Sequence, residues 1–273
     1  IAENELMYLE HGFEGQNIYH VAYGTSSAKS LTLSFWVKSP LAGKHAVTFY
    51  QQTPARSNLQ SYTVSSANTW EHKTITIDGD TSGNIVNDES HEFTIFWPLA
   101  GGSNFHGTPH TGWGAYSATD DFMFSDQVNL AGQTGNFYLT GVQLEVGDKA
   151  TPFEHRSFAD ELARCQRYYY QLVQGSYMIV GMNDTTSTCE TTFALPVEMR
   201  QDPTLGTSGT ASNYSIRQAG VTKTCDSLPT ILGGGGKQIV GVRFYDSAGL
   251  DTSYASYCYG NTSGADLKLD AEF

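Results

Sequence analysis

The chain of 273 residues is long enough for one large β domain or two ordinary ones, each with its own core. Gly, Ser, Thr, Asn and Tyr are abundant and only 16% of residues are charged, which favours short strands joined by turns. The formal net charge of −13 argues against nucleic acid as a partner, because phosphates are neutralised by clustered Lys and Arg.

Four segments of the first half alternate apolar with polar residues, which is the pattern of half-buried strands. They are 30–37, 70–77, 91–97 and 136–146. In the first segment the alternation puts Leu31, Leu33, Phe35 and Val37 on one face. Sequences rich in Gly, Asp and Ser separate the segments, as turns do. We therefore predict an all-β fold with an antiparallel two-sheet β-sandwich in the first half.

A domain boundary is expected near Pro152, because proline cannot donate a hydrogen bond within a sheet. Ser157 offers a helix N-cap, and Asp160 and Glu161 suit the positive end of a short helix. The predicted organisation is a first domain over 1–156, a helical connector over 157–170 and a second β domain over 171–273.

The second half is also predicted to be β-sandwich-like. Its strand-like sequences are 176–180, 191–195, 238–245 and 267–273. The four glycines of 233–236 are too flexible for a strand interior and predict a loop.

Three stretches of the first half stand out, in this order: EGQNIYHVAYGTSSAKSLTLSFWVKSP (14–40), ANTWEHKTITIDGDTSG (67–83) and GNFYLTGVQLEVGDKATPFEHRSFADELARCQRYYY (135–170). Together they resemble, in the same order, stretches of structural proteins of tailed phages. In those proteins a jelly-roll module, related to carbohydrate-binding modules, belongs to a tail-fibre, tail-tip or head-fibre protein. The resemblance covers much of residues 10–170, whereas 171–259 resembles nothing specific. The closing DLKLDAEF is similar to the ends of many fibre chains.

The resemblance implies a jelly-roll first domain, a distal second domain and attachment to a host-surface glycan or receptor. It also implies a homotrimer that assembles with other virion proteins in the host cytoplasm and resides in the virion. It supplies no catalytic residues, so we expect no enzyme activity and no cofactor. Membrane insertion is not expected, since no apolar run approaches about 20 residues. Because Ile1 has no Met before it, we expect this chain to be the folded part of a longer protein, or a processed protein.

The sequence from Asp78 to Glu89 matches the twelve-position calcium loop D-x-D-x-S-G-x-I-x-x-x-E. Asp78, Asp80 and Glu89 would supply the hard oxygen ligands that Ca²⁺ prefers. An EF-hand has helices on both sides of this loop, however, and here the flanking sequences are strand-like. An acidic solvated loop is therefore the favoured interpretation, and a structural Ca²⁺ is the alternative.

A second candidate site is the loop 105–116, FHGTPHTGWGAY, with Trp97 shortly before it. Aromatic rings stack on the C–H faces of sugars, and neighbouring His side chains can hydrogen-bond the hydroxyls. The residues of this predicted glycan platform are Trp97, His106, His110, Trp113 and Tyr116. The opposing interpretation places Trp97 and Trp113 in the core and the loop over a sheet edge.

Arg164 and the consecutive Tyr168, Tyr169 and Tyr170 form a third candidate surface. Successive side chains of a strand point to opposite faces, so at least one tyrosine must meet something other than a simple core. Tyr and Arg are favoured at protein interfaces. A contact with a neighbouring subunit and packing between the two domains of one chain are equally compatible with this pattern.

Sequence motifs of common enzyme classes are missing: the chain has no GxSxG, HExxH, P-loop or GxGxxG after a strand. Glycosidase carboxylate pairs leave no such motif, and nothing singles out Glu92, Asp120 or Asp121. The four cysteines show no zinc-ligand spacing and are expected to be free thiols.

These features favour a non-catalytic phage virion appendage that attaches to the host surface. One alternative is a monomeric carbohydrate-binding module of a glycan-degrading enzyme, which predicts a solvent-facing aromatic platform. The other is a purely structural virion decoration or adaptor protein, which predicts that Trp97 and Trp113 are buried and that no sugar binds.

Overall fold

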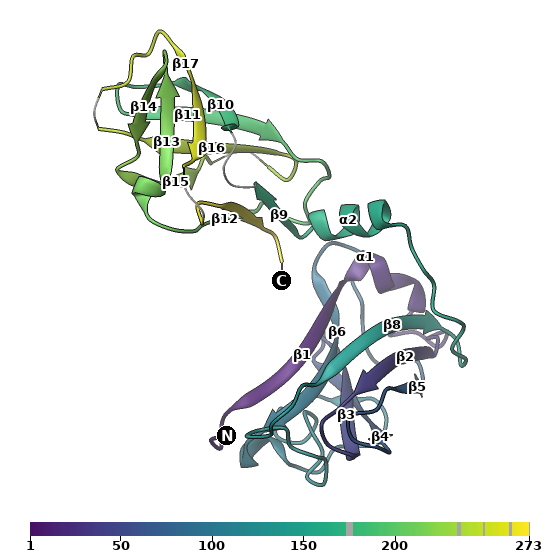
Figure 1. Ribbon diagram of the computed structural model, residues 1–273. Coiled ribbons are helices and arrows are strands. Elements are labelled where there is room, and N and C mark those ends of the chain that lie inside the picture. The colour runs from purple at the N-terminus through teal and green to yellow at the C-terminus, as the bar shows by residue number, and fades with distance from the viewer. Residues whose placement is uncertain (173–176, 234–235, 248, 262–263, 273) are drawn as a thin grey trace. The chain divides into compact units, whose positions relative to one another are not determined.

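The computed structural model describes residues 1–172, 177–233, 236–247, 249–261 and 264–272. The chain divides into two compact units, Ile1–His155 and Arg156–Phe273. Both are built of strands with a few short helices, which confirms the expected all-β class (Figure 1). Among the described residues, no helix is long and apolar enough to cross a membrane.

The first unit is an antiparallel sandwich of two sheets. The larger sheet has the order β1 (Leu6–Glu14), β6 (His91–Gly101), β3 (Gly43–Gln51), β4 (Arg56–Val64) and β7 (Gly114–Ala115). The smaller sheet has the order β5 (Glu71–Ile77), β2 (Leu31–Lys38) and β8 (Tyr138–Val146). Short helical turns are α1 (Gly15–Ile18), η1 (Tyr19–Val21) and η2 (Ser103–Phe105). The core of this unit lies between the two sheets.

Strand β2 is the middle strand of the smaller sheet, and its alternation decides which side chains enter the core. Leu31, Leu33, Phe35 and Val37 are buried, as the sequence pattern predicts. Trp36 lies between two of them in sequence and is 44% exposed on the opposite face. Inward and outward side chains therefore alternate along β2 with a period of two.

Strand β6 supplies the facing half of the core. Phe93, Ile95 and Trp97 are all buried, and the rings of Trp97 and Phe35 meet edge to face with centroids 6.0 Å apart. This edge-to-face geometry is favoured by the ring quadrupoles. Trp97 is thus part of the contact between the two sheets.

The outer face of the larger sheet is covered by a segment of the long connection between β6 and β8. Thr48 of β3 donates a hydrogen bond to the main-chain oxygens of Asp121 (3.2 Å) and Phe122 (3.3 Å). The Phe122 ring packs against Phe96 of β6 and Tyr8 of β1, and both Asp121 and Phe122 are buried. This connection therefore forms a third layer over the sandwich.

The second unit also contains two antiparallel sheets around one core. Its larger sheet has the order β14 (Val221–Thr224), β13 (Tyr214–Gln218), β17 (Ala255–Gly260), β10 (Tyr177–Asn183), β11 (Thr188–Ala194), β16 (Ile239–Tyr245) and β15 (Ser227–Ile231). Its smaller sheet has the order β12 (Thr204–Thr207), β18 (Leu267–Asp270) and β9 (Tyr169–Leu172). The turn η3 (Ala211–Asn213) precedes β13. Expected strand residues 176 and 273, and residues 234–235 of the expected glycine loop, lie outside the described residues.

Helix α2 (Phe158–Gln166) begins where the sequence predicts. The Ser157 hydroxyl accepts a hydrogen bond from the Asp160 main-chain nitrogen at 3.2 Å, and Asp160 and Glu161 occupy the first turn. Both features stabilise a helix N-terminus.

All four cysteines are free thiols. Cys165 is exposed, whereas Cys189, Cys225 and Cys258 are buried in the second unit. The sulfurs of Cys189 and Cys258 are 3.4 Å apart, and burial raises the pKa of Cys225 to about 12. These buried thiols act as small apolar side chains of the core.

The opposite placement of Trp97 and Trp36 predicts a large difference in stability between two matched variants. Trp97→Ala removes a buried ring and should lower the free energy of unfolding by about 3–5 kcal/mol. Trp36→Ala removes a half-exposed ring and should cost about 1 kcal/mol or less. Urea unfolding followed by circular dichroism measures both values. Equal losses would contradict the assignment of Trp97 to the core and Trp36 to the surface.

Candidate functional site

The structure does not assemble the predicted glycan platform of loop 105–116 as one exposed surface. Trp97 is only 2% exposed because it shares the inward alternation of Phe93 and Ile95 on β6. Trp113 is half-buried against the core, and its Nε1 donates to the main-chain oxygen of Asp78 at 2.8 Å. A stacking sugar needs an open ring face, so Trp97 is unsuited to that role.

The remaining three residues of the predicted platform are half-buried. The ring of Tyr116 meets Tyr50 of β3 edge on, with centroids 4.8 Å apart. One ring nitrogen of His106, Nε2, is buried and has no hydrogen-bond partner among the described residues. His110 bridges the loop to β4.

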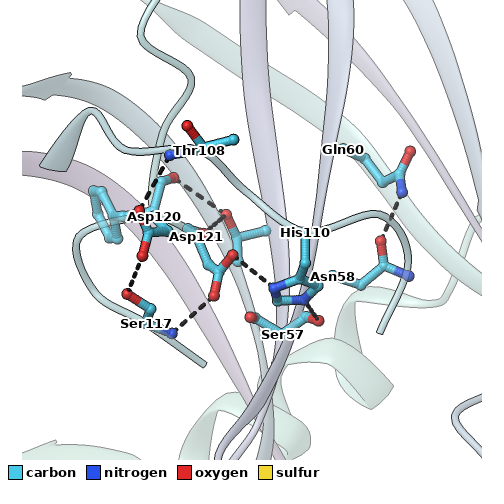
Figure 2. A network of polar contacts seen from close by, with 10 residues as sticks. Ser57, Asn58, Gln60, Thr108, His110, Ser117, Asp120 and Asp121 are labelled. Atoms are coloured by element: carbon cyan, nitrogen blue, oxygen red, sulfur yellow. Dashed lines mark hydrogen bonds and ion pairs between the residues drawn. The ribbon is translucent and has the colours of Figure 1, made fainter. Parts of the chain in front are cut away.

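His110 fastens the loop to the larger sheet, as Figure 2 shows. Its Nδ1 lies 2.9 Å from the Asp121 carboxylate, and its Nε2 lies 2.9 Å from the main-chain oxygen of Ser57. Asp121 is buried and also accepts a hydrogen bond from the Ser117 main-chain nitrogen at 2.8 Å. Gly114 gives the ring room, because a Cβ there would lie 2.6 Å from the imidazole. His110 therefore has a clear structural role.

The combination of Ser57, His110 and Asp121 has the residue types of a hydrolase triad but not its geometry. In such a triad the imidazole Nε2 contacts the serine hydroxyl. Here Nε2 contacts the main-chain oxygen of Ser57 instead. The Ser57 hydroxyl is buried and, among the described residues, has no hydrogen-bond partner. This arrangement presents no activated nucleophile to a substrate.

Side-chain contacts hold one carboxylate of the candidate calcium loop. The Asp80 carboxylate is buried and accepts hydrogen bonds from Arg56 Nε (2.5 Å), Gln51 Nε2 (2.6 Å) and the Ser82 main-chain nitrogen (3.0 Å). A guanidinium thus already balances its charge. Asp78 and Glu89 are both exposed. Within the described residues, no cluster of three or more His, Cys, Asp or Glu could hold a metal ion.

The tyrosines of the third candidate surface point in different directions. Tyr170 packs against the core of the second unit, while Tyr169, its neighbour on β9, is 37% exposed. Tyr168 is half-buried, and Arg164 is exposed on α2. The placement agrees with the alternation of a strand. A role of these residues in a subunit interface stays a prediction.

A different part of the first unit carries exposed aromatic side chains on one surface. On the outer side of the smaller sheet, Trp36, Trp70 and Tyr138 are 43–44% exposed, and His72 is exposed beside them. Trp36 and His72 have ring centroids 5.3 Å apart, and Trp70 and Tyr138 have centroids 6.0 Å apart. We call these four residues the aromatic outer face.

Strand pairing explains how the aromatic outer face is assembled. Trp36 of β2 is paired with His72 of β5 on one side and with Thr140 of β8 on the other. Tyr138 is paired with Lys38, whose Nζ lies 5.3 Å from the centre of the tyrosine ring. Gly141 has a φ of +58° at a β-bulge, and a Cβ there would lie 3.3 Å from the Trp36 ring. The glycine thus leaves room for the indole over β8.

Trp70 is positioned by the residue that follows it. The Glu71 carboxylate accepts hydrogen bonds from the main-chain nitrogens of Ser65 and Ser66, both at 2.8 Å, and pairs with Lys73 Nζ at 2.6 Å. It therefore closes the turn that leads from β4 into β5. These contacts, with the Lys73 hydrogen bond as the largest cause, lower the pKa of Glu71 to about 2.

The alternation of 30–37 contained the signal for Trp36, since a strand that buries Phe35 and Val37 must point Trp36 outward. Tyr138 has the same signal in 136–146. His72 and Trp70 join these residues only when β5 pairs with β2, which no local pattern specifies.

No family model matches the chain, and the search of curated proteins finds no match for it.

The low pKa of Glu71 predicts how pH acts on this corner of the sandwich. Because ionisation is favoured in the folded state, Glu71 contributes stability fully above the unfolded pKa of 4.5 and loses it as pH falls toward about 2. The difference in unfolding free energy between wild type and Glu71→Gln should therefore shrink across that range.

Titration of the Glu71 carboxyl carbon by NMR measures the pKa directly. The Lys73→Met variant removes the hydrogen bond that is the largest cause of the low Glu71 pKa. The titration midpoint of Glu71 should therefore rise toward 4.5. A wild-type midpoint near 4.5 would show that the ion pair and the turn hydrogen bonds are not formed.

Proposed function

We propose that the first unit is a non-catalytic saccharide-binding module of a phage virion appendage. The observation that carries this proposal is the aromatic outer face, on which Trp36, Trp70 and Tyr138 present half-exposed rings beside His72.

The chemistry of this surface suits a sugar chain. Aromatic ring faces attract the C–H groups of a pyranose, while neighbouring polar groups hydrogen-bond its hydroxyls. Lys38, His72 and Thr140 lie beside the rings and can supply such bonds. Grouped exposed aromatics are typical of interaction surfaces, because apolar area is otherwise buried.

The assignment to a phage appendage rests on the resemblance of 14–40, 67–83 and 135–170 to tail-fibre, tail-tip and head-fibre proteins. On this proposal the chain forms a homotrimer, joins other virion proteins and contacts a host-surface glycan or receptor. Three copies would present three such faces. Linked sites raise apparent affinity by roughly 10²–10⁴ per pair, so each face can bind weakly.

A purely structural appendage protein is the second candidate. It is favoured by the burial of Trp97 and by the half-buried Trp113, which packs against the core. On that account the aromatic outer face would contact another virion protein, and no sugar would bind. A direct binding measurement separates the two candidates.

Binding to an array of bacterial O-polysaccharides, capsular polysaccharides and peptidoglycan fragments tests the proposal. We expect the protein to bind at least one glycan of this array. Trp36→Ala and Trp70→Ala should each weaken that binding by about tenfold or more, as expected for the loss of about 1.4 kcal/mol of ring contact. Tyr19→Ala is the matched control, because Tyr19 is 53% exposed outside the aromatic outer face.

Circular dichroism and thermal unfolding must show that each variant keeps its fold. Absence of binding to every glycan on the array, or equal losses in Tyr19→Ala and Trp36→Ala, would reject the aromatic outer face as a saccharide site.

The proposed trimer gives a separate prediction. Size-exclusion chromatography with light scattering should find a mass about three times the 29.8 kDa of one chain. A monomer at micromolar concentration would contradict an autonomous trimer and favour an isolated binding module.

A further inference from the structure

A polar cleft opens at the edge of the first unit, where β4 of the larger sheet and β5 of the smaller sheet lie next to each other. Its volume is about 460 Å³, within the range of small-molecule sites. Four segments line it: Arg56, Asn58 and Gln60 on β4, Thr76 and Ile77 on β5, the loop 78–82 and the loop 111–113.

Interactions between these segments hold the cleft in shape. Arg56 binds the Asp80 carboxylate through Nε (2.5 Å) and Nη2 (3.1 Å), which joins β4 to the loop 78–82. The indole Nε1 of Trp113 donates to the main-chain oxygen of Asp78 at 2.8 Å, which joins the third and fourth segments. Because these hydrogen bonds already fix the segments, less conformational entropy is lost when a ligand binds.

The charges of the lining restrict the chemical class of ligand. Arg56 is the cation of the lining, and its guanidinium is already paired with buried Asp80. Asp78 adds a second negative charge, so an anionic ligand such as a phosphate or carboxylate is disfavoured. A metal cation is also disfavoured, because Asp80 accepts bonds from Arg56, Gln51 and Ser82. A neutral ligand fits best.

The uncharged lining groups match a hydroxyl-rich molecule. Gln60 Nε2 donates to Asn58 Oδ1 at 2.6 Å, so the two amides form one unit of donors and acceptors (Figure 2). Hydroxyls of Thr81 and Ser82 add groups that both donate and accept, whereas the Thr76 hydroxyl is already hydrogen-bonded to the Thr32 hydroxyl at 2.9 Å. Trp113 supplies apolar surface, whereas Ile77 is buried in the core. A sugar ring has hydroxyls around its rim and C–H groups on its faces. It can therefore hydrogen-bond the polar lining groups and contact the apolar surface.

We propose that this cleft binds a single neutral sugar unit, such as the end of a glycan chain. It is a second site, since it shares no residue with the aromatic outer face. The inference stands on the cleft alone and does not need the appendage assignment.

Saturation-transfer NMR with six methyl glycosides tests the proposal. The probes are those of glucose, galactose, mannose, rhamnose, N-acetylglucosamine and N-acetylgalactosamine. At least one should bind the wild-type protein. Thr81→Trp fills the cleft from its exposed rim and should lower the affinity for that sugar at least tenfold. Ser125→Trp, at an exposed residue outside the cleft, should leave it unchanged.

Two further variants distinguish the cleft from the aromatic outer face and give a second test of the cleft in case Thr81→Trp does not fold. Gln60→Leu keeps similar bulk but removes the amide, so it should also weaken binding. Trp36→Ala should not affect the cleft. The proposal is overturned if none of the six sugars binds, or if Thr81→Trp and Gln60→Leu bind as wild type does. Loss in Trp36→Ala alone would assign the sugar to the aromatic outer face and equally overturn it.

Discussion

The register of β2 is the constraint on which the first unit depends. Its inward residues, such as Leu33 and Phe35, form one wall of the core, and its outward Trp36 belongs to the aromatic outer face. Because side chains alternate with a period of two, a shift of one residue would expose the first set and bury Trp36. Antiparallel pairing with both β5 and β8 opposes such a shift. Core packing and surface chemistry are therefore set by one strand.

At the edge of the sandwich, the contacts are between charged and polar side chains rather than between apolar ones. Arg56 and Asp80 form a largely buried ion pair there, and Gln51 adds a hydrogen bond to the same carboxylate. Removing one partner of a buried pair leaves an uncompensated charge, which costs about 3–5 kcal/mol. The cleft is lined by both members of this pair.

Local pattern was sufficient to predict much of the fold. Alternation identified the core residues of β2, and the Ser157 cap located the start of α2. The same alternation also determines the burial of Trp97 and the exposure of Trp36, although residue type alone drew attention to Trp97. A rule about strand geometry was therefore more informative than the presence of a tryptophan.

Contacts between distant segments were beyond the reach of any local pattern. The spacing of Asp78, Asp80 and Glu89 matches a calcium loop, yet the partner of Asp80 is Arg56, which lies 24 residues earlier in the chain. His110 likewise finds Ser57, 53 residues away. The cleft needs four segments spread from residue 56 to residue 113. Such sites exist only after the sheets have paired.

The two proposed sites differ in how they would recognise a saccharide. Ring stacking on the aromatic outer face would depend little on which hydroxyls are present, so this face would tolerate many sugars. The cleft would place amides and hydroxyls around a sugar, and one that failed to match them would leave buried polar groups unpaired, at about 1–3 kcal/mol each. Discrimination by unpaired groups is stronger than discrimination by apolar contact. Together, a tolerant surface would retain a glycan chain while the cleft selects its end. Specificity would then reside in Gln60, which donates to the buried Asn58, rather than in the exposed tryptophans.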